Sequence, residues 1–252
     1  MAPVRVRKTR QKNDQGLALI QSDRLRRQAL VKFDLVIFDC DGVLVDSEVI
    51  SCRVHAEVLT RHGYPISVAQ VFDRFLGRSS RHAHLEVEAE LGRSLPDDFH
   101  SQLQDELFQS FTATLETIPY IDQALAAIAQ PVCVASSGSQ DRMRVSLGRS
   151  GLYDKFAPHI FSATQVEHGK PAPDLFLFAA AQMATAPERC LVIEDSVAGI
   201  AGALAAGMTV FGFHGGSHCR PGYGDTLRAA GAAVTFDDMR QLPGLIGQIG
   251  AN

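Results

Sequence analysis

Asp39 and Asp41 are the first residues in the chain whose type and spacing suit chemistry. They directly follow a short apolar run and lie two residues apart, which in an extended chain places both side chains on the same side. Carboxylates arranged in this way can hold a divalent cation. An Asp-x-Asp pair after a strand is also common as a turn or a helix cap, so the pair alone leaves both interpretations open.

Three further segments place polar residues beside apolar runs, and six of these residues could bind metal or phosphate: Ser136, Ser137, Gly138, Lys170, Glu194 and Asp195. Glu194 and Asp195, close to the first two aspartates, would concentrate negative charge, which is costly unless a cation neutralises it. A hard divalent ion with oxygen ligands meets this need, and Mg²⁺ is the usual one beside phosphates. Ser136 and Lys170 would offer a hydroxyl group and a positive charge to the phosphate.

Short runs that are apolar on both faces predict strands buried between two helical layers. Four such runs and a weaker fifth occur at 35–38, 132–135, 191–193, 209–213 and 233–236. Helix-period stretches occur between them at 122–129, 140–147, 174–183 and 196–206. This alternation predicts an α/β fold with a doubly wound parallel sheet. Ligands bind beyond the carboxyl ends of such strands, which is where the polar segments lie.

Residues 49–117 interrupt the alternation of strands and helices. This stretch has no comparable apolar strand, and its periodicity predicts helices at 55–62, 68–75, 82–91 and 97–115. Gly63, Gly77 and Gly92 would join these helices. We therefore expect a helical insertion after the first strand.

Composition limits the class of protein. A chain of 252 residues that is 46% hydrophobic fits one α/β domain with a smaller insertion. No apolar run approaches the roughly 18 residues of a membrane span, and the start lacks a secretory signal. We expect a cytoplasmic protein with no membrane partner. Its five scattered cysteines predict reduced thiols that pack like small apolar residues.

Positive charge is concentrated at the start of the chain. Residues 1–32 carry nine Lys and Arg and two Asp, a net charge of +7, so the total of −4 leaves −11 for residues 33–252. The basic stretch has no interleaved aromatic residues and no binding motif, and we expect a disordered extension over 1–32. The acidic remainder argues against nucleic acid as the principal partner.

Four segments carry a family resemblance: FDCDGVLVDSE at 38–48, VASSGS at 134–139, GKPAPD at 169–174 and VIEDSVAGI at 192–200. Together they resemble the haloacid dehalogenase superfamily, and within it the phosphatases with a helical cap. The match runs in order over residues 33–252. It implies a Rossmann-like core at 33–48 and 118–252, a cap at 49–117, and magnesium-dependent phosphoryl transfer to and from a small phosphorylated metabolite.

The resemblance also implies roles for individual residues. Asp39 would attack phosphorus and become an aspartyl phosphate. Asp41 would protonate the leaving oxygen and then take a proton from water, and burial under the closed cap should raise its pKa. Asp39, the Asp41 carbonyl and Asp195 would hold Mg²⁺, with Glu194 as a ligand or an outer-sphere partner. The phosphoryl oxygens would be bound by Ser136 and Lys170, with Ser137 and Gly138 beside them.

Other members of the superfamily differ from this chain at identifiable positions. The dehalogenases lack an acid at the position of Asp41, and the phosphonate-cleaving members need a cap lysine, which residues 49–117 do not contain. Mutases of the β-phosphoglucomutase type carry a hinge histidine where this chain has Ser51. That difference favours a phosphatase. A mutase, or a non-catalytic regulator that binds a phosphorylated metabolite, remains the alternative.

The exact residues of these segments most resemble phosphatases that act on sugar or sugar-acid phosphates such as 6-phosphogluconate. Phosphoglycolate is the second candidate substrate. Arg78 and Arg81 lie in the cap loop that would meet the substrate beyond its phosphate. They would suit hydroxyl groups or a carboxylate, although the same residues also fit a solvated helix start. We expect a monomer or a weak homodimer.

Overall fold

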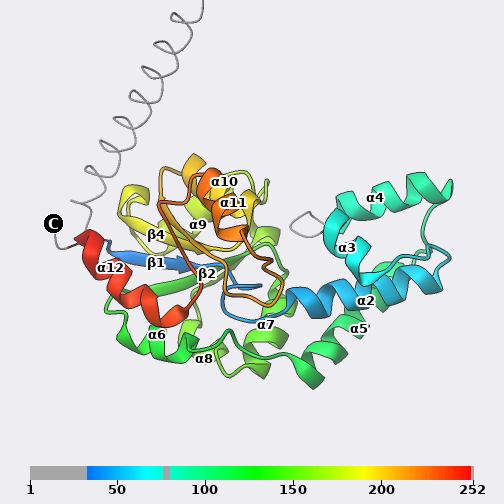
Figure 1. Cartoon of the computed structure of the whole chain (residues 1–252), viewed down its shortest axis with the longest axis horizontal. Helices are drawn as coiled ribbons and strands as arrows, with labels where there is room; N and C mark the ends of the chain where they lie inside the picture. Colours follow the sequence, from blue (N-terminus) through cyan, green and yellow to red (C-terminus); the bar gives the residue numbers. More distant parts are fainter. Residues whose placement is uncertain (1–32, 76–79, 251–252) are drawn as a thin grey trace, which may run out of the picture.

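The computed structural model describes residues 33–75 and 80–250, so the predicted extension at 1–32 and the junction at Gly77 lie outside the described residues. Six parallel strands form one sheet in the order β3-β2-β1-β4-β5-β6 (Figure 1). Their bounds are β1 (Leu35–Phe38), β2 (Val132–Ser136), β3 (Ile160–Ser162), β4 (Cys190–Glu194), β5 (Thr209–Phe213) and β6 (Val234–Phe236).

The central strands are buried on both faces of the sheet. Every residue of β1 is fully buried: Val36 and Phe38 belong to one apolar core, whereas Leu35 and Ile37 belong to the other. Because successive side chains point to opposite faces, a strand covered on both sides must be apolar at every position. The burial of β1 on both faces therefore confirms the prediction of buried strands from runs of apolar residues.

Helices cover the two faces of the sheet. One core contains side chains from α6 (Ile121–Ala127), α7 (Gln140–Arg149), α8 (Tyr153–Phe156) and α12 (Leu242–Gly250). The other contains side chains from α9 (Asp174–Gln182), α10 (Val197–Ala205) and α11 (Tyr223–Ala229). Short 3₁₀ turns occur at Ala163–Gln165, Pro187–Arg189 and Met239–Gln241. The result is the doubly wound α/β architecture that the sequence predicted.

The predicted helical insertion is present. It consists of α2 (Glu48–Arg61), α3 (Val68–Phe75), α4 (Ser80–Leu91) and α5 (Phe99–Thr114). Figure 1 shows these helices as a group that projects from the sheet, with α5 also packed on α7. The two chain segments that connect the group to the sheet hydrogen-bond to each other: Asp46 N–H donates to the Glu116 carbonyl at 3.0 Å, and Ile118 N–H donates to the Leu44 carbonyl at 3.0 Å.

Some elements differ from the sequence-based expectation. Strand β3 was not predicted, because it has only three residues and ends in Ser162, so it shows no apolar run. Helices α8, α11 and α12 were not predicted either. Helix α2 begins at Glu48 rather than residue 55, since Cys52 and Val54 are buried in the core and stabilise a first turn whose β-branched residues have weak helix propensity.

The other predicted helices of the sheet region agree with the structure to within two residues at each end. All five cysteines are free thiols and four of them are buried, as predicted. Among the described residues, none of the helices is both long enough and apolar enough to cross a membrane.

Candidate active site

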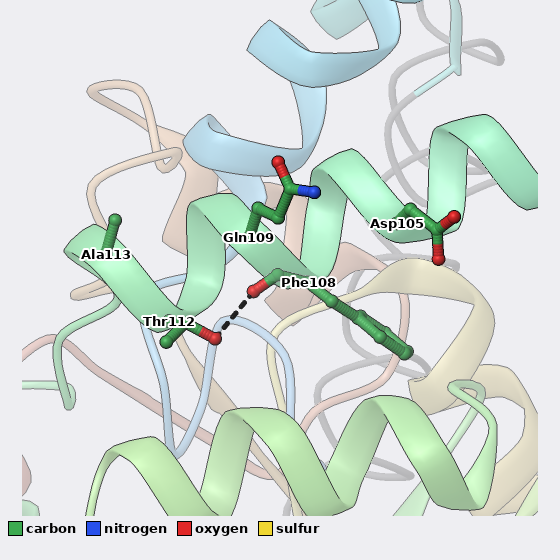
Figure 2. Close-up of a pocket in the computed structure, with 5 residues that line it drawn as sticks. All are labelled: Asp105, Phe108, Gln109, Thr112 and Ala113. Carbon is green, nitrogen blue, oxygen red and sulfur yellow. Dashed lines mark hydrogen bonds between the residues drawn. The ribbon is translucent and has the colours of Figure 1, made fainter.

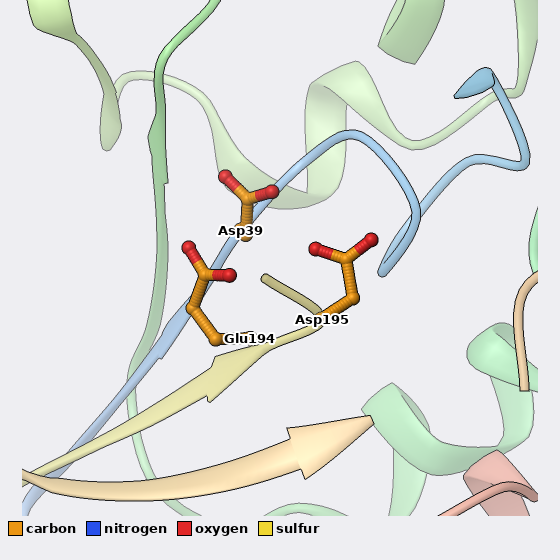
Figure 3. A group of neighbouring side chains, drawn as sticks. All are labelled: Asp39, Glu194 and Asp195. Atoms are coloured by element: carbon orange, nitrogen blue, oxygen red, sulfur yellow. The ribbon is translucent and has the colours of Figure 1, made fainter. Parts of the chain in front are cut away.

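Three carboxyl groups meet at the carboxyl end of the sheet. Asp39 directly follows β1, and its N–H donates to the Ile193 carbonyl at 3.0 Å, which places it beside the end of β4. Glu194 ends β4 and Asp195 follows it. Ligand oxygens of Asp39, Glu194 and Asp195 lie within 4.8 Å of one another, all three residues are buried, and Figure 3 shows their side chains grouped around one space.

Lys170 is held between two of these carboxylates. Its Nζ donates to Asp39 Oδ1 at 2.6 Å, to Glu194 Oε1 at 2.6 Å and to the Ala135 carbonyl at 2.9 Å. An ammonium group has three donors, so all of them are used. Burial disfavours the charge of Lys170, but the two carboxylates outweigh burial and raise its pKa above the ordinary value. Lys170 is therefore a buried cation fixed against Asp39.

Both oxygens of Glu194 are occupied. Oε1 accepts from Lys170, and Oε2 accepts from the N–H and the hydroxyl of Ser196, each at 2.9 Å. Gly199 packs against the same carboxylate so closely that a Cβ atom there would overlap it. These contacts favour Glu194 as an outer-sphere residue that holds Lys170.

Asp195 has a partner that the sequence analysis missed. Nε2 of His218 lies 3.0 Å from Asp195 Oδ2, and both side chains are buried. Burial lowers the pKa of His218, but the bond to Asp195 outweighs this and raises it to about 11. His218 follows β5 by five residues, so the rule that polar residues gather beyond strand ends could have found it.

The residues present fit a divalent cation. Burial raises the pKa of Asp39 well above its usual range, with contributions from Glu194 and Asp195 and an opposing one from Lys170. Three carboxylates face two cations, Lys170 and His218, which leaves one negative charge uncompensated. One oxygen of Asp39 and one of Asp195 accept no hydrogen bond from any described residue. Carboxylate oxygens are the ligands that Mg²⁺ prefers.

Asp41 lies in a different environment from Asp39. Its Oδ1 accepts from Ser47 Oγ at 2.5 Å and from Arg142 Nη2 at 2.8 Å. The expectation that the pKa of Asp41 is raised is wrong for this structure. Burial alone would raise it, but the Arg142 guanidinium and the hydrogen bonds from Arg142 and Ser47 together lower it. No sequence signal pointed to Arg142.

The serine segment lies next to Lys170. Ser136 ends β2 and is buried, and its Oγ accepts from the Gly138 N–H at 3.0 Å. The Gly138 carbonyl accepts from Ser162 Oγ at 2.6 Å, whereas Ser137 is exposed. The adjacent Ala135 carbonyl binds Lys170. The segment is thus placed beside Asp39, and its role in binding phosphate stays a prediction.

The hinge position of the mutases holds a serine with two hydrogen bonds. Ser51 Oγ donates to the Ser47 carbonyl at 2.9 Å and accepts from Arg142 Nη2 at 3.2 Å. His55 Nδ1 lies 2.8 Å from the Ser51 carbonyl, so this histidine is tied to its own helix.

The two predicted cap arginines are not placed by the structure. Arg78 lies outside the described residues, and Arg81 belongs to α4 but its side chain is not among the described parts. Their contact with a substrate stays a prediction.

A pocket of about 500 Å³ lies along α5, lined by Asp105, Phe108, Gln109, Thr112 and Ala113 (Figure 2). Its residues include none of the carboxyl cluster. The chemistry of the side chains, rather than the volume of this hollow, identifies the candidate active site.

Comparison with known proteins agrees with this geometry. The family model of the haloacid dehalogenase-like hydrolases matches residues 33–207. The chain belongs to this family. The 6-phosphogluconate phosphatase of Escherichia coli K12 is 33% identical over 215 residues, which cover 85% of this chain and 95% of that protein.

Solved structures show the same fold. A haloacid dehalogenase-like protein from Agrobacterium tumefaciens C58 is 42% identical, with a TM-score of 0.75 over 85% of this chain and 98% of that one. A family hydrolase from Deinococcus radiodurans R1, solved with bound phosphate and sodium, is 32% identical, with a TM-score of 0.71 over 87% and 97%. The family match and the phosphatases among the relatives confirm the expected enzyme class, a phosphoric monoester hydrolase.

Proposed function

We propose that this protein hydrolyses a small sugar or sugar-acid phosphate by transferring the phosphoryl group to Asp39. The observation that carries the proposal is the environment of this carboxylate. Lys170 holds one of its oxygens, and the other accepts no hydrogen bond from the described residues. A buried carboxylate fixed on one side and open on the other is suited to act as a nucleophile.

The side chains around Asp39 can carry out both halves of the reaction. The open oxygen of Asp39 attacks phosphorus, and the bond between phosphorus and the ester oxygen breaks. Asp41 gives a proton to the departing oxygen, then takes a proton from the water that attacks the aspartyl phosphate. Because Arg142 and Ser47 lower the pKa of Asp41 in this structure, its carboxyl group must gain the first proton as the substrate binds. Ser136 binds a phosphoryl oxygen, and Lys170 supplies positive charge beside the group where negative charge accumulates in the transition state.

Magnesium fits the same arrangement. Asp39, Asp195 and the Asp41 carbonyl would hold the ion, and Glu194 would support it through Lys170 rather than as a ligand, because both Glu194 oxygens are occupied. When bound, Mg²⁺ supplies positive charge against the transferring phosphoryl group.

The four inserted helices, residues 49–117, are proposed to act as a cap over a core formed by 33–48 and 118–252. Arg142 of α7 supports this arrangement, since it hydrogen-bonds to Ser51 of α2 and its guanidinium carbon lies 5.0 Å from the centre of the Phe111 ring of α5. The inserted helices therefore contact a residue that also binds Asp41.

For the substrate, we propose 6-phosphogluconate or a closely related sugar-acid phosphate. The support is the relative of that name, which is similar to this chain over 95% of its own length. The test is release of inorganic phosphate from a panel of phosphorylated sugars, sugar acids, polyols, nucleotides and phosphoglycolate. Each compound is assayed with Mg²⁺ and again with excess EDTA. Turnover of no ester, or full turnover in EDTA, would contradict the proposal.

A further inference from the structure

Arg142 occupies a position between three parts of the active site. On one side it bonds to Asp41, the proposed acid, and on another to Ser51 of the inserted helices. On a third side its stem packs against the serine segment, since a Cβ atom on Gly138 would lie 3.1 Å from Arg142 Cδ. Arg142 therefore borders the place where a substrate extends beyond its ester oxygen.

The hydrogen-bonding capacity of Arg142 is only partly used. A guanidinium group has five N–H donors in a planar fork. Within the described part of the chain, Nη2 makes the bonds to Asp41 and Ser51, and Nε is buried without a partner. Nη1 also makes no hydrogen bond to a described residue, yet it is not among the buried unpartnered atoms, so it can reach solvent or a ligand.

The position of Arg142 relative to the reaction follows from Asp41. The leaving oxygen must lie within hydrogen-bond distance of the Asp41 carboxyl group to receive its proton. Arg142 Nη2 is 2.8 Å from the same carboxyl group. The carbon skeleton of the substrate therefore begins beside the guanidinium group, whose Nη1 has donors left for an oxygen of the substrate and whose positive charge favours a carboxylate.

We propose that Arg142 binds the carboxylate of the substrate through Nη1 and so determines a preference for sugar-acid phosphates over neutral sugar phosphates. This assignment rests on the proposed function and adds to it the residue that selects the substrate. The guanidinium group of Arg142 already forms an ion pair with one carboxylate, that of Asp41. The ring of Phe111, with its centre 5.0 Å from the guanidinium carbon, keeps the group in place.

The experiment compares two esters that differ at one carbon. 6-Phosphogluconate carries a carboxylate at C1, and glucitol 6-phosphate carries a hydroxymethyl group there. We expect Arg142→Met to lower kcat/KM for 6-phosphogluconate by about 100-fold, mainly through KM, and for glucitol 6-phosphate by less than about 10-fold. Arg142→Lys, which keeps the charge but not the fork, should fall between the wild type and Arg142→Met for the acid.

Two further variants control for structural effects. Arg144 lies on the same helix, is exposed, and has its guanidinium carbon 5.4 Å from the centre of the Tyr153 ring, so Arg144→Met should leave both esters unaffected. Arg142→Gln retains an amide donor for Asp41 without the charge, and it gives the same comparison should Arg142→Met fail to fold. Binding of both esters to the Asp39→Asn protein, with and without Arg142→Met, measured by titration calorimetry, should show the same selective loss.

The outcomes separate the two proposals. Equal losses of kcat/KM for the two esters would overturn the assignment of carboxylate binding to Arg142, because the variant would then act only through Asp41. The phosphatase proposal would stand in that case. A wild-type protein that hydrolyses no phosphate ester would overturn the proposed function and this assignment with it.

Discussion

His218 Nε2 lies 3.0 Å from Asp195 Oδ2, and less than a tenth of either side chain is exposed. Gly42 and Gly216 pack so closely around this pair that a Cβ atom on either would contact the imidazole ring within 3.0 Å. The bond leaves the other oxygen of Asp195 free of hydrogen bonds from the described residues. In the proposed magnesium site, His218 would thus fix which oxygen of Asp195 is open to the ion.

We expect His218→Leu to weaken Mg²⁺ binding by roughly 10- to 100-fold, the usual cost of losing a residue that orients a metal ligand. His218→Gln, which can still donate a hydrogen bond, should recover part of the affinity. Titration calorimetry of Mg²⁺ measures this, with the exposed His168→Leu as the control. An unchanged dissociation constant in His218→Leu would show that Asp195 needs no such partner.

Gly199→Ala should reduce both stability and activity. The added methyl group would overlap the Glu194 carboxylate, which is fixed by Lys170 and by two bonds from Ser196. We expect a loss of roughly 2 to 3 kcal/mol in the free energy of unfolding, measured with urea. Gly148→Ala is the matched control, since its Cβ would meet no atom within 4 Å. Equal stabilities of the two variants would contradict the prediction.

Asp39→Asn should abolish turnover, by a factor of about 10⁴ or more, because an amide oxygen is a poor nucleophile. The far-ultraviolet circular dichroism spectrum should not change. The measurement is phosphate release under saturating substrate and Mg²⁺. A comparable kcat in the variant would remove Asp39 from the mechanism, and a wild type that binds esters without hydrolysing them would indicate a regulator.

Ser51 leads to a prediction of the product that forms from β-glucose 1-phosphate. Ser51 is hydrogen-bonded to Arg142 and offers no imidazole to link sugar binding to the acid. Incubation with this ester, with or without a bisphosphate primer, should yield inorganic phosphate or no product. Both phosphate and glucose 6-phosphate are assayed over time. Formation of glucose 6-phosphate faster than phosphate release would establish a mutase.

His84 should make stability depend on pH. Its ring is buried among Phe99, His55 and His100 with neither nitrogen hydrogen-bonded, and burial, aided by the two histidines, lowers its pKa to about 4. The unfolded chain binds this proton near pH 6.5, so the unfolded state gains protons first as the pH falls, and stability is lost between about pH 6.5 and pH 4.

The comparison with His84→Phe isolates this effect from that of other groups. Between pH 7 and pH 4.5 the wild type should lose roughly 2 to 3 kcal/mol relative to the variant, measured by urea unfolding. The exposed His168→Phe should show no such difference from the wild type. Parallel pH profiles for the wild type and His84→Phe would contradict the assignment.

Local sequence patterns predicted the main strands and the carboxyl cluster, because each apolar run and the polar residues after it lie close together in the sequence. The order of apolar runs identified strands whose carboxyl ends lie together, and the polar residues after them met as expected. Arg142 and His218 were missed because their importance comes from contacts across the fold. Arg142 is 101 residues from Asp41 in sequence, and no local pattern shows that its side chain reaches back to an acid.

The same contact explains the wrong expectation for the pKa of Asp41. Burial was foreseen, but the guanidinium group that outweighs it was not. The short strand β3 was missed for a similar reason: its three residues are specified by pairing with β2, not by their own pattern.

The paired connections between the sheet and the inserted helices have an evolutionary consequence. Because the Asp46 N–H bonds to Glu116 and the Ile118 N–H to Leu44, the insertion leaves and rejoins the sheet at one place. A segment whose ends already touch can change in length at little entropic cost to the rest of the fold. Under the proposed function, natural selection can therefore exchange the inserted helices while Asp39 and Asp41 stay unaltered, so that new substrates are acquired without a change in the chemistry.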